Sequence, residues 1–168
     1  MIFIGVGSNL AAKSFHSPLD TINAALGVFH EFGIGIEDVS PWYKSSPVPI
    51  SNQPWFVNGV LRISTEHNPE NTLQSLHRIE KKFERERSKL NAARTLDLDL
   101  LDFNGSITET SSSIKLPHPR MEERAFVLLP LRDICSSWTS PSTGLSIEKL
   151  IGQLPEEQVC EKLIFKEK

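Results

Sequence analysis

Two helix-start signals constrain the fold of this chain more than any other feature. They mark two helices that separate the strand-like segments. Ser17-Pro18 and Asn68-Pro69 each place a capping side chain before a proline, the residue that suits the first position of a helix. Apolar residues then recur at helical spacing over 18–32 and again beyond Pro69. The other apolar segments are typical of strands, and they cover residues 2–6, 36–43, 56–63 and 95–101. The chain is therefore expected to have an α+β fold.

The order of these elements is strand, helix, strand, strand, helix, strand. It predicts a ferredoxin-like βαββαβ fold, in which one antiparallel sheet carries both helices on one face. Ser/Thr-rich turns at 106–113 and a helix near 121–135 follow as a C-terminal extension. Because no repeat or linker divides the chain, residues 1–168 are expected to form a single domain.

Composition limits the classes of function. Hydrophobic residues make up 39% and charged residues 23% of the chain, as in ordinary globular proteins. A net charge of −3 argues against nucleic acid as a partner, and no apolar run approaches the length of a membrane span. Cys135 and Cys160 show neither metal-ligand spacing nor a disulfide framework, which fits a reducing compartment. We therefore expect a cytoplasmic protein, and we expect it to be a monomer.

The segment 96–100 alternates leucines with Asp97 and Asp99. Successive side chains of a strand point to opposite faces, so the two aspartates share one face. A solvent-facing strand explains such alternation, but aspartate is disfavoured in strands and two like charges repel unless a cation lies between them. Two neighbouring carboxylates could hold a pair of Mg²⁺ ions, an arrangement used in phosphoryl displacement. By the same alternation Asp102 falls on the leucine face, outside the site.

A basic cluster directly precedes this strand. Between residues 81 and 94 only Glu84 and Glu86 oppose the basic side chains, which are Lys81, Lys82, Arg85, Arg87, Lys89 and Arg94. Basic residues favour a helix C-terminus, which is the simpler explanation of the cluster. Next to two carboxylates, the cluster instead suits a metal–polyphosphate. The stretch GVGSN at 5–9 lacks the Gly-Lys-Ser/Thr of a phosphate loop, and we interpret it as a tight turn.

Further candidates each have a structural alternative. Glu80 lies beside the buried stripe of its helix and could form a salt bridge or reach the site. His118, between two prolines, could be a turn residue or a donor to a nucleotide. Asn58 could bind the edge of a planar ring, with Phe56 and Phe126 as stacking faces or as core residues. Together these residues predict a two-magnesium phosphotransferase site with an aromatic, amide-lined pocket.

Five stretches of the sequence resemble the 6-hydroxymethyl-7,8-dihydropterin pyrophosphokinase family. They occur in the family's order over about residues 1–135: GVGSNL, QPWFVN, RIEKKFERER, RTLDLDLLDF and LPHPRMEERAFVLLPL. The resemblance implies a ferredoxin-like fold. It also implies that pyrophosphate moves from ATP, the co-substrate, to the hydroxymethyl group of 6-hydroxymethyl-7,8-dihydropterin, with AMP as the other product, in folate biosynthesis. The hydroxyl would attack the β-phosphorus in line, assisted by two Mg²⁺ ions.

The resemblance further implies roles for individual residues. Asp97 and Asp99 would hold the two Mg²⁺ ions, and Arg85 and Arg94 would act on the phosphates. The expected ATP-binding residues are Glu80, His77, His118, Arg124 and Arg94. The pterin would lie between two aromatic rings, and its expected contacts are Ser45, Ser46, Val48, Phe56, Asn58, Phe126 and Asp97.

One loop departs from the family. Asn91-Ala92-Ala93-Arg94 stands where the family commonly has Trp-Gly-Pro-Arg, so this stretch lacks the aromatic residue and the proline. We also expect the loop before the aspartate strand to be one residue shorter than in familiar members. We predict that it closes less tightly, which would raise KM or slow the committed step. Two alternatives to the pyrophosphokinase remain open at this point. One is a nucleotidyl- or phosphotransferase with the same fold and another acceptor, and the other is a regulatory ferredoxin-like module that binds a small molecule without turnover.

Overall fold

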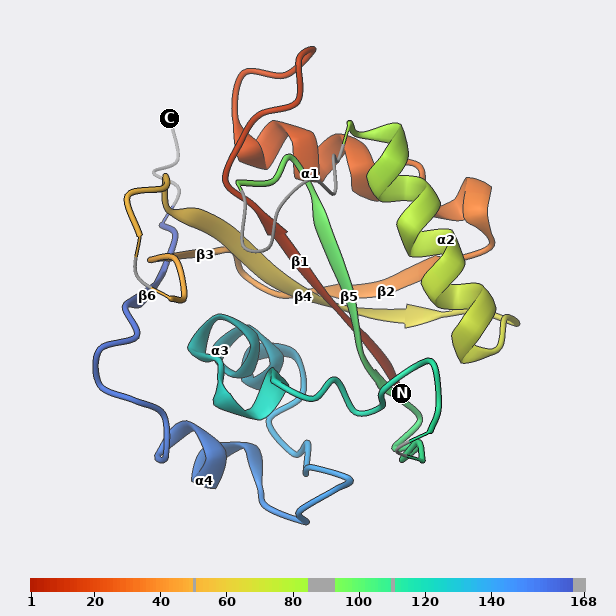
Figure 1. The fold of residues 1–168 in the computed structure, drawn as a ribbon, viewed down its shortest axis with the longest axis vertical. Helices are drawn as coiled ribbons and strands as arrows, with labels where there is room; N and C mark the ends of the chain where they lie inside the picture. The colour runs from red at the N-terminus through yellow and green to blue at the C-terminus, as the bar shows by residue number, and fades with distance from the viewer. Residues whose placement is uncertain (50, 85–92, 110, 165–168) are drawn as a thin grey trace.

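The computed structural model describes residues 1–49, 51–84, 93–109 and 111–164. In these residues helices pack on both faces of a six-stranded sheet (Figure 1). The elements, in chain order, are β1 (Ile2–Ser8), α1 (Pro18–Leu26), the 3-10 turn η1 (Phe29–Phe32), β2 (Gly35–Val39), β3 (Tyr43–Ser45), β4 (Phe56–Ser64), α2 (Pro69–Lys82), β5 (Asp97–Phe103), the 3-10 turn η2 (Met121–Glu123), α3 (Ala125–Ile134), α4 (Ile147–Ile151) and β6 (Cys160–Lys162).

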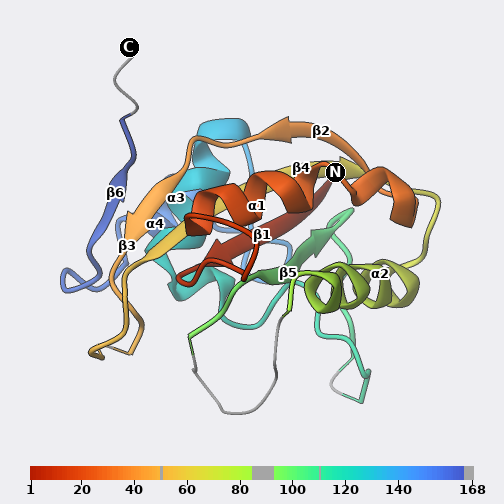
Figure 2. The same cartoon turned by 90° about the horizontal axis from the view of Figure 1, so that it is seen from above.

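The sheet has the strand order β5-β1-β4-β3-β6, and β2 also pairs with β4. Every one of these pairings is antiparallel. The four predicted strands therefore keep the order expected of a split βαββαβ arrangement. The C-terminal β6 adds a strand beside β3 at the edge of the sheet (Figure 2). The α+β fold class predicted from the sequence is confirmed.

The strand predicted at 36–43 is broken into β2 and β3. Pro41 has no N–H to donate to a neighbouring strand, and a proline is tolerated in a sheet only where the ladder is interrupted. Ser40 bridges the break, because its N–H donates to Val60 O at 2.9 Å and its Oγ accepts from Val60 N at 2.9 Å. The continuous β4 thus pairs with two short strands in succession.

Both long helices begin at the predicted residues. Ser17 Oγ accepts from Asp20 N at 3.1 Å, and Asn68 Oδ1 accepts from Asn71 N at 2.8 Å. These bonds satisfy N–H groups that the start of a helix leaves without an intrahelical partner. The two proline-based start signals are therefore confirmed.

Two helices are shorter than predicted. α1 ends at Leu26 rather than at Phe32, because a separate 3-10 turn follows it and ends at Gly33. Gly33 has a φ of 73°, a left-handed conformation that favours glycine. The helix predicted near 121–135 divides into η2 and α3, because Arg124 between them has an extended backbone.

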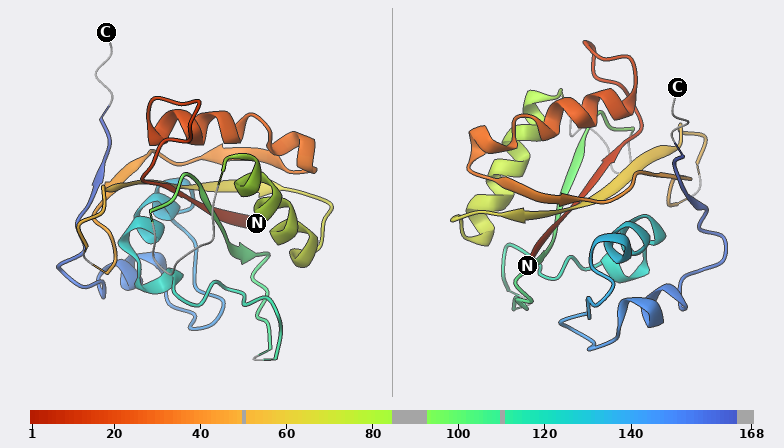
Figure 3. Two further views of the ribbon diagram at one scale, coloured as in Figure 1. Left: turned by 45° about the horizontal axis from the view of Figure 1, so that its top comes forward. Right: turned by 180° about the vertical axis from the view of Figure 1, so that it is seen from behind.

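Each face of the sheet has its own pair of helices (Figure 1, Figure 3). α1 and α2 pack on one face, where Ile22 and Ile79 belong to the same buried core as Leu98 and Leu100 of β5. α3 and α4 cover the other face, around Phe3, Leu128 and Leu131. Among the described residues, none of the helices is both long and apolar enough to cross a membrane.

A bulge in β5 corrects one prediction. The pairing of β1 with β5 shifts between Phe3 and Ile4, so Leu101 is an extra residue of β5. A bulge of this kind reverses the alternation of faces beyond it. Asp102 consequently lies opposite Phe3 on the α3 face, where its Oδ2 accepts from Trp138 Nε1 at 2.8 Å. The prediction that Asp102 shares the leucine face is therefore wrong, although its carboxylate is still engaged away from the site.

Candidate active site

A pocket of about 280 Å³ lies on the α3 face of the sheet. Residues of β1, β4 and β5 form its floor, and the loop after β3 and the start of α3 form its walls. Many of the residues that the sequence predicts for the site line it, namely Ser45, Ser46, Val48, Phe56, Asn58, Arg94, Asp97, Asp99, Arg124 and Phe126. The fold thus brings predicted phosphate-binding and ring-binding side chains from distant segments into one pocket.

Two glycines of β1 leave room for the pocket. Gly5 lies opposite Asp99, and Gly7 lies opposite Asp97, in the pairing of β1 with β5. A Cβ atom at Gly7 would lie 3.0 Å from Asn58 Oδ1, closer than side chains normally approach. The interpretation of this stretch as a tight turn is wrong, because β1 continues past Gly7. Glycine at alternate positions of a strand is the sequence signal for such a floor.

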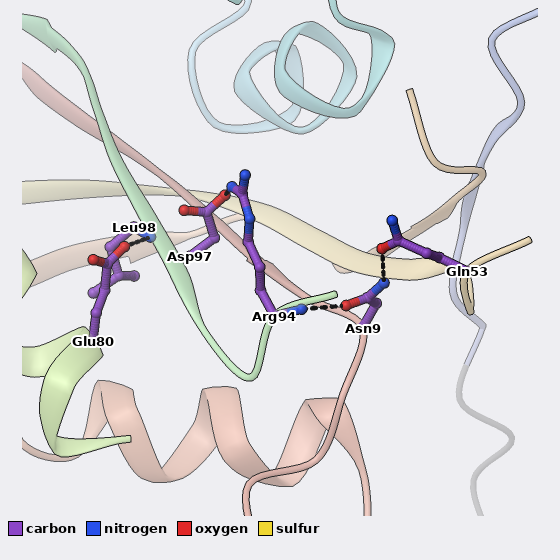
Figure 4. Close-up of polar contacts among 6 residues, drawn as sticks. All are labelled: Asn9, Gln53, Glu80, Arg94, Asp97 and Leu98. Carbon is purple, nitrogen blue, oxygen red and sulfur yellow. Dashed lines mark hydrogen bonds and ion pairs between the residues drawn. The ribbon is translucent and has the colours of Figure 1, made fainter. Parts of the chain in front are cut away.

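Strand β5 presents its acidic side chains to the pocket. Asp97 and Asp99 line it, whereas Leu98 and Leu100 are only 2% and 4% exposed and belong to the core beneath α1 and α2. Nη1 of Arg94 forms an ion pair with Oδ2 of Asp97 (Figure 4). Two carboxylates and a guanidinium on one surface can together bind a phosphate chain and its counter-cation.

The donor set of the pocket fits Mg²⁺ that is shared with phosphate. Among the described residues, no group of three or more His, Cys, Asp or Glu side chains is placed to hold a metal ion. Mg²⁺ usually binds to one or two carboxylates together with substrate phosphates and water. Asp97 and Asp99 supply that number of ligands, so the predicted Mg²⁺ fits this pocket as a partner of a bound nucleotide.

Glu80 supports β5 from α2. The residue is 1% exposed, and its Oε1 accepts from the N–H of Leu98 at 2.8 Å (Figure 4). In the described sheet β5 is the end strand, so this bond occupies a backbone donor that β1 does not use. Glu80 and His77, both on α2, are not among the residues that line the pocket. Their contacts with ATP stay predictions.

His118 lies beside the acidic strand. Its N–H donates to Leu101 O at 2.7 Å, and its Nδ1 accepts from the N–H of Arg120 at 3.2 Å. The neutral imidazole therefore carries its proton on Nε2, as a donor. Burial lowers the pKa of His118, and the charges of Arg124 and Arg120 act in the same direction, while Asp99 acts against them. These effects favour a neutral imidazole. His118 is not among the residues that line the pocket, and its contact with ATP stays a prediction.

Asn58 and two aromatic rings form the other side of the pocket. Asn58 is 4% exposed, and its Nδ2 donates to Ser45 Oγ at 2.7 Å. Phe56 of β4 lies opposite Ser45 of β3 and lines the pocket, as does Phe126 at the start of α3. The guanidinium carbon of Arg124 lies 5.3 Å from the centre of the Phe126 ring. This side offers apolar ring faces and a fixed amide, which suits a flat, polar-edged molecule.

Asn9 connects the two sides of the site, and sequence reasoning missed it. Its Oδ1 accepts from the N–H of Arg94 at 2.7 Å, and its Nδ2 donates to Gln53 Oε1 at 3.3 Å (Figure 4). Nδ2 also donates to Pro54 O at 3.1 Å. Asn9 is 3% exposed, and a buried amide at the end of a strand is the kind of signal that could have identified it.

Two residues of the pocket were not predicted, and some predicted residues lie outside the described part of the chain. Arg120 and Gln53 also line the pocket and were not among the predicted site residues. Arg85 and the Asn91-Ala92 part of the preceding loop lie outside the described residues. Their predicted roles, catalytic for Arg85 and closure for the loop, stay predictions.

The sequence matches one family model. Residues 3–136 match the model described as 7,8-dihydro-6-hydroxymethylpterin-pyrophosphokinase. A Pseudomonas aeruginosa protein named 2-amino-4-hydroxy-6-hydroxymethyldihydropteridine pyrophosphokinase is 36% identical over 94% of this chain and 94% of its own length. A Synechocystis protein of the same name is 36% identical over 90% of this chain and 74% of its own length.

Longer relatives and solved structures extend the comparison. The folic acid synthesis protein fol1 of Schizosaccharomyces pombe is 32% identical over 94% of this chain, which spans 21% of that protein. The crystal structure of the wild-type HPPK-DHPS protein of Plasmodium falciparum covers 90% of this chain with a TM-score of 0.66. This chain spans 43% of that structure, and the identity of 13% makes the likeness one of fold.

The family model and the bacterial relatives indicate the same family as the motifs in the sequence. The match covers most of the chain and includes both sides of the pocket. The expectation that the chain is of the pyrophosphokinase type is confirmed at the level of the family. This chain belongs to the 7,8-dihydro-6-hydroxymethylpterin-pyrophosphokinase family.

Proposed function

We propose that this chain transfers pyrophosphate from ATP to the hydroxymethyl group of 6-hydroxymethyl-7,8-dihydropterin, giving the pterin diphosphate and AMP in folate biosynthesis. One observation carries the proposal: a single pocket holds the acidic and basic side chains that phosphates need and the rings and amide that a pterin needs. A phosphotransferase with a different acceptor would not require the two rings and the amide.

The carboxylates account for the proposed metal dependence. Asp97 and Asp99 would hold two Mg²⁺ ions, which would supply positive charge to neutralise the phosphates. Arg94 already pairs with Asp97, so its guanidinium stands where it can exchange a carboxylate for a phosphate oxygen. Arg124, which lines the same pocket, supplies a second guanidinium.

The chemistry is an in-line displacement. The hydroxyl oxygen of the pterin forms a bond to the β-phosphorus, and the bond from that phosphorus to the oxygen bridging it to the α-phosphate breaks. The bridging oxygen leaves with AMP, and the proton of the hydroxyl passes to solvent. A loose transition state of this type depends mainly on positioning and charge stabilisation. We assign the general-base role to no side chain.

Recognition of the pterin follows from the fixed amide. The bond from Asn58 Nδ2 to Ser45 Oγ leaves Oδ1 on the side of Gly7, where it can accept from ring N–H groups. Phe56 and Phe126 would cover the two faces of the ring. The neutral His118, with its proton on Nε2, would donate to an acceptor on ATP.

The test is AMP release from ATP and Mg²⁺, with and without the pterin, by wild type, Asp97→Asn and the control Asp20→Asn on an exposed turn of α1. We expect pterin-dependent AMP from wild type and Asp20→Asn, and its loss in Asp97→Asn. Release of ADP or phosphate instead would indicate another acceptor. Pterin binding without turnover would indicate a regulatory module.

Compartment and assembly are separate proposals. Cys135 and Cys160 are both free thiols, which supports a reducing compartment and hence the cytoplasm. The monomeric state stays a prediction, which light scattering on the purified protein tests.

A further inference from the structure

The C-terminal segment 158–160 contacts the α3 wall of the pocket through one side chain. Gln158 Oε1 accepts from the N–H of Ala125 at 2.9 Å, and Gln158 Nε2 donates to Glu123 O at 2.7 Å. These two backbone groups flank Arg124, which lines the pocket and lies over the ring of Phe126. Gln158 therefore holds the backbone on both sides of a predicted ATP-binding residue.

The contact of Gln158 with Ala125 replaces the N-terminal cap that the residue just before α3 does not provide. The first N–H groups of a helix lack intrahelical partners and are usually capped by the residue just before the helix. Arg124 holds that position in α3, and its side chain makes no capping hydrogen bond. The amide of Gln158, from a distant part of the sequence, supplies the acceptor. The direction of the first turn of α3 thus depends on the C-terminal segment.

The same segment also contacts the opposite wall. Val159 O accepts from the N–H of Ser46 at 3.1 Å, and Cys160 lies opposite Ser45 in the pairing of β3 with β6. Ser45 and Ser46 line the pocket, and Ser45 Oγ accepts from Asn58. Residues 158–160 therefore connect the wall that carries Arg124 and Phe126 to the wall that carries Ser45, the hydrogen-bond partner of Asn58.

We propose that residues 158–160 set the separation of the two pocket walls and that Gln158 is a positioning residue for pterin binding, an inference that rests on the proposed function. Gln158 does not line the pocket. Loss of its amide should weaken the fit of a flat ring between the walls, because Ala125 directly precedes Phe126. Asp97 and Asp99 lie on β5, which neither of these hydrogen bonds of Gln158 reaches, so the metal-dependent chemistry should stay in place. The expected signature is a rise in KM for the pterin with little change in kcat.

The experiment compares Gln158→Met, Gln158→Glu and the control Gln153→Met. Methionine keeps the length of glutamine without its hydrogen bonds, whereas glutamate can still accept from Ala125 but cannot donate to Glu123. Gln153 is exposed and its side chain forms no hydrogen bond within the described part of the chain. We expect KM and Kd for the pterin to rise about tenfold in Gln158→Met, the loss of one to two modest hydrogen bonds, and less in Gln158→Glu.

Equal KM values in Gln158→Met and Gln153→Met would overturn the proposal, and so would a loss of thermal stability with KM unchanged. Hydrogen exchange of the wild type provides a test that needs no variant to fold: the amides of Ala125 and Ser46 should be protected. Rapid exchange at both amides would refute the proposal that residues 158–160 hold the two pocket walls. Absence of pterin-dependent AMP in the wild type would instead refute the proposed function. The exchange result would still show whether residues 158–160 hold the two pocket walls.

Discussion

Replacing Gly7 with alanine should separate binding of the pterin from stability of the fold. The added Cβ would lie 3.0 Å from Asn58 Oδ1 and 3.9 Å from the Cβ of Asp97. Asn58 cannot easily move away, because it is 4% exposed and its Nδ2 is held by Ser45 Oγ at 2.7 Å. The methyl group would therefore press on the atom that we expect to accept from the pterin.

The two consequences differ in size. In the middle of a strand, alanine is favoured over glycine by roughly 0.5–1 kcal/mol, which offsets part of the crowding and keeps the change in unfolding free energy small. A pterin N–H that loses its acceptor costs about 1–3 kcal/mol, because the buried group stays unpaired. At about 1.4 kcal/mol per factor of ten, this corresponds to a fall of roughly 5- to 150-fold in kcat/KM.

The assay measures kcat/KM for the pterin and the urea midpoint of unfolding in wild type, Gly7→Ala and Gly27→Ala. Gly27 ends α1 with a φ of −61°, and a Cβ there would meet its nearest atom at 3.4 Å, so it is a tolerant control. We expect Gly7→Ala to lose activity at nearly unchanged stability and Gly27→Ala to lose neither. Wild-type activity in Gly7→Ala would refute the assignment of Asn58 as the pterin acceptor.

Two further predictions concern the α3 face away from the pocket. Trp138→Phe leaves Oδ2 of Asp102 without its indole donor, so urea unfolding should show a loss of about 1–3 kcal/mol while KM for the pterin stays at its wild-type value; unchanged stability would contradict this. Burial acts to raise the pKa of Asp133, but hydrogen bonds from Tyr43 and Lys162 lower it overall. A lowered carboxylate pKa stabilises the fold above the ordinary value of about 3.9 and loses this contribution as the pH falls through the folded value. The urea midpoint should therefore fall less between pH 7 and pH 3 in Asp133→Asn than in wild type, and equal falls would contradict the assignment.

The elements that the sequence predicted correctly are those fixed by neighbours in the chain. The caps at Ser17 and Asn68 act over three residues, and the alternation of β5 follows from the geometry of a single strand. The break at Pro41 was not predicted, although a proline, which cannot donate to a sheet, is a local signal for it. The bulge at Leu101 has no such local signal, since it depends on how β5 is paired with β1.

The same distinction applies to the site. Residue types and spacing sufficed to select Asp97, Asp99 and Asn58, which lie on strands with one face toward the pocket. Asn9 and Gln158 act through partners that are distant in sequence, and no local pattern encodes such a contact. Supporting residues of this kind become visible only when the fold is known.

The hydrogen bond from Leu98 to Glu80 has a consequence for encounters between molecules. An end strand exposes backbone donors and acceptors that a strand of a second molecule can use, and natural proteins cover such positions. The buried carboxylate of Glu80 occupies the Leu98 donor near the start of the strand that carries the two aspartates. We therefore expect the side chain that steadies the acidic strand also to make it a poorer template for pairing with a strand of a second molecule.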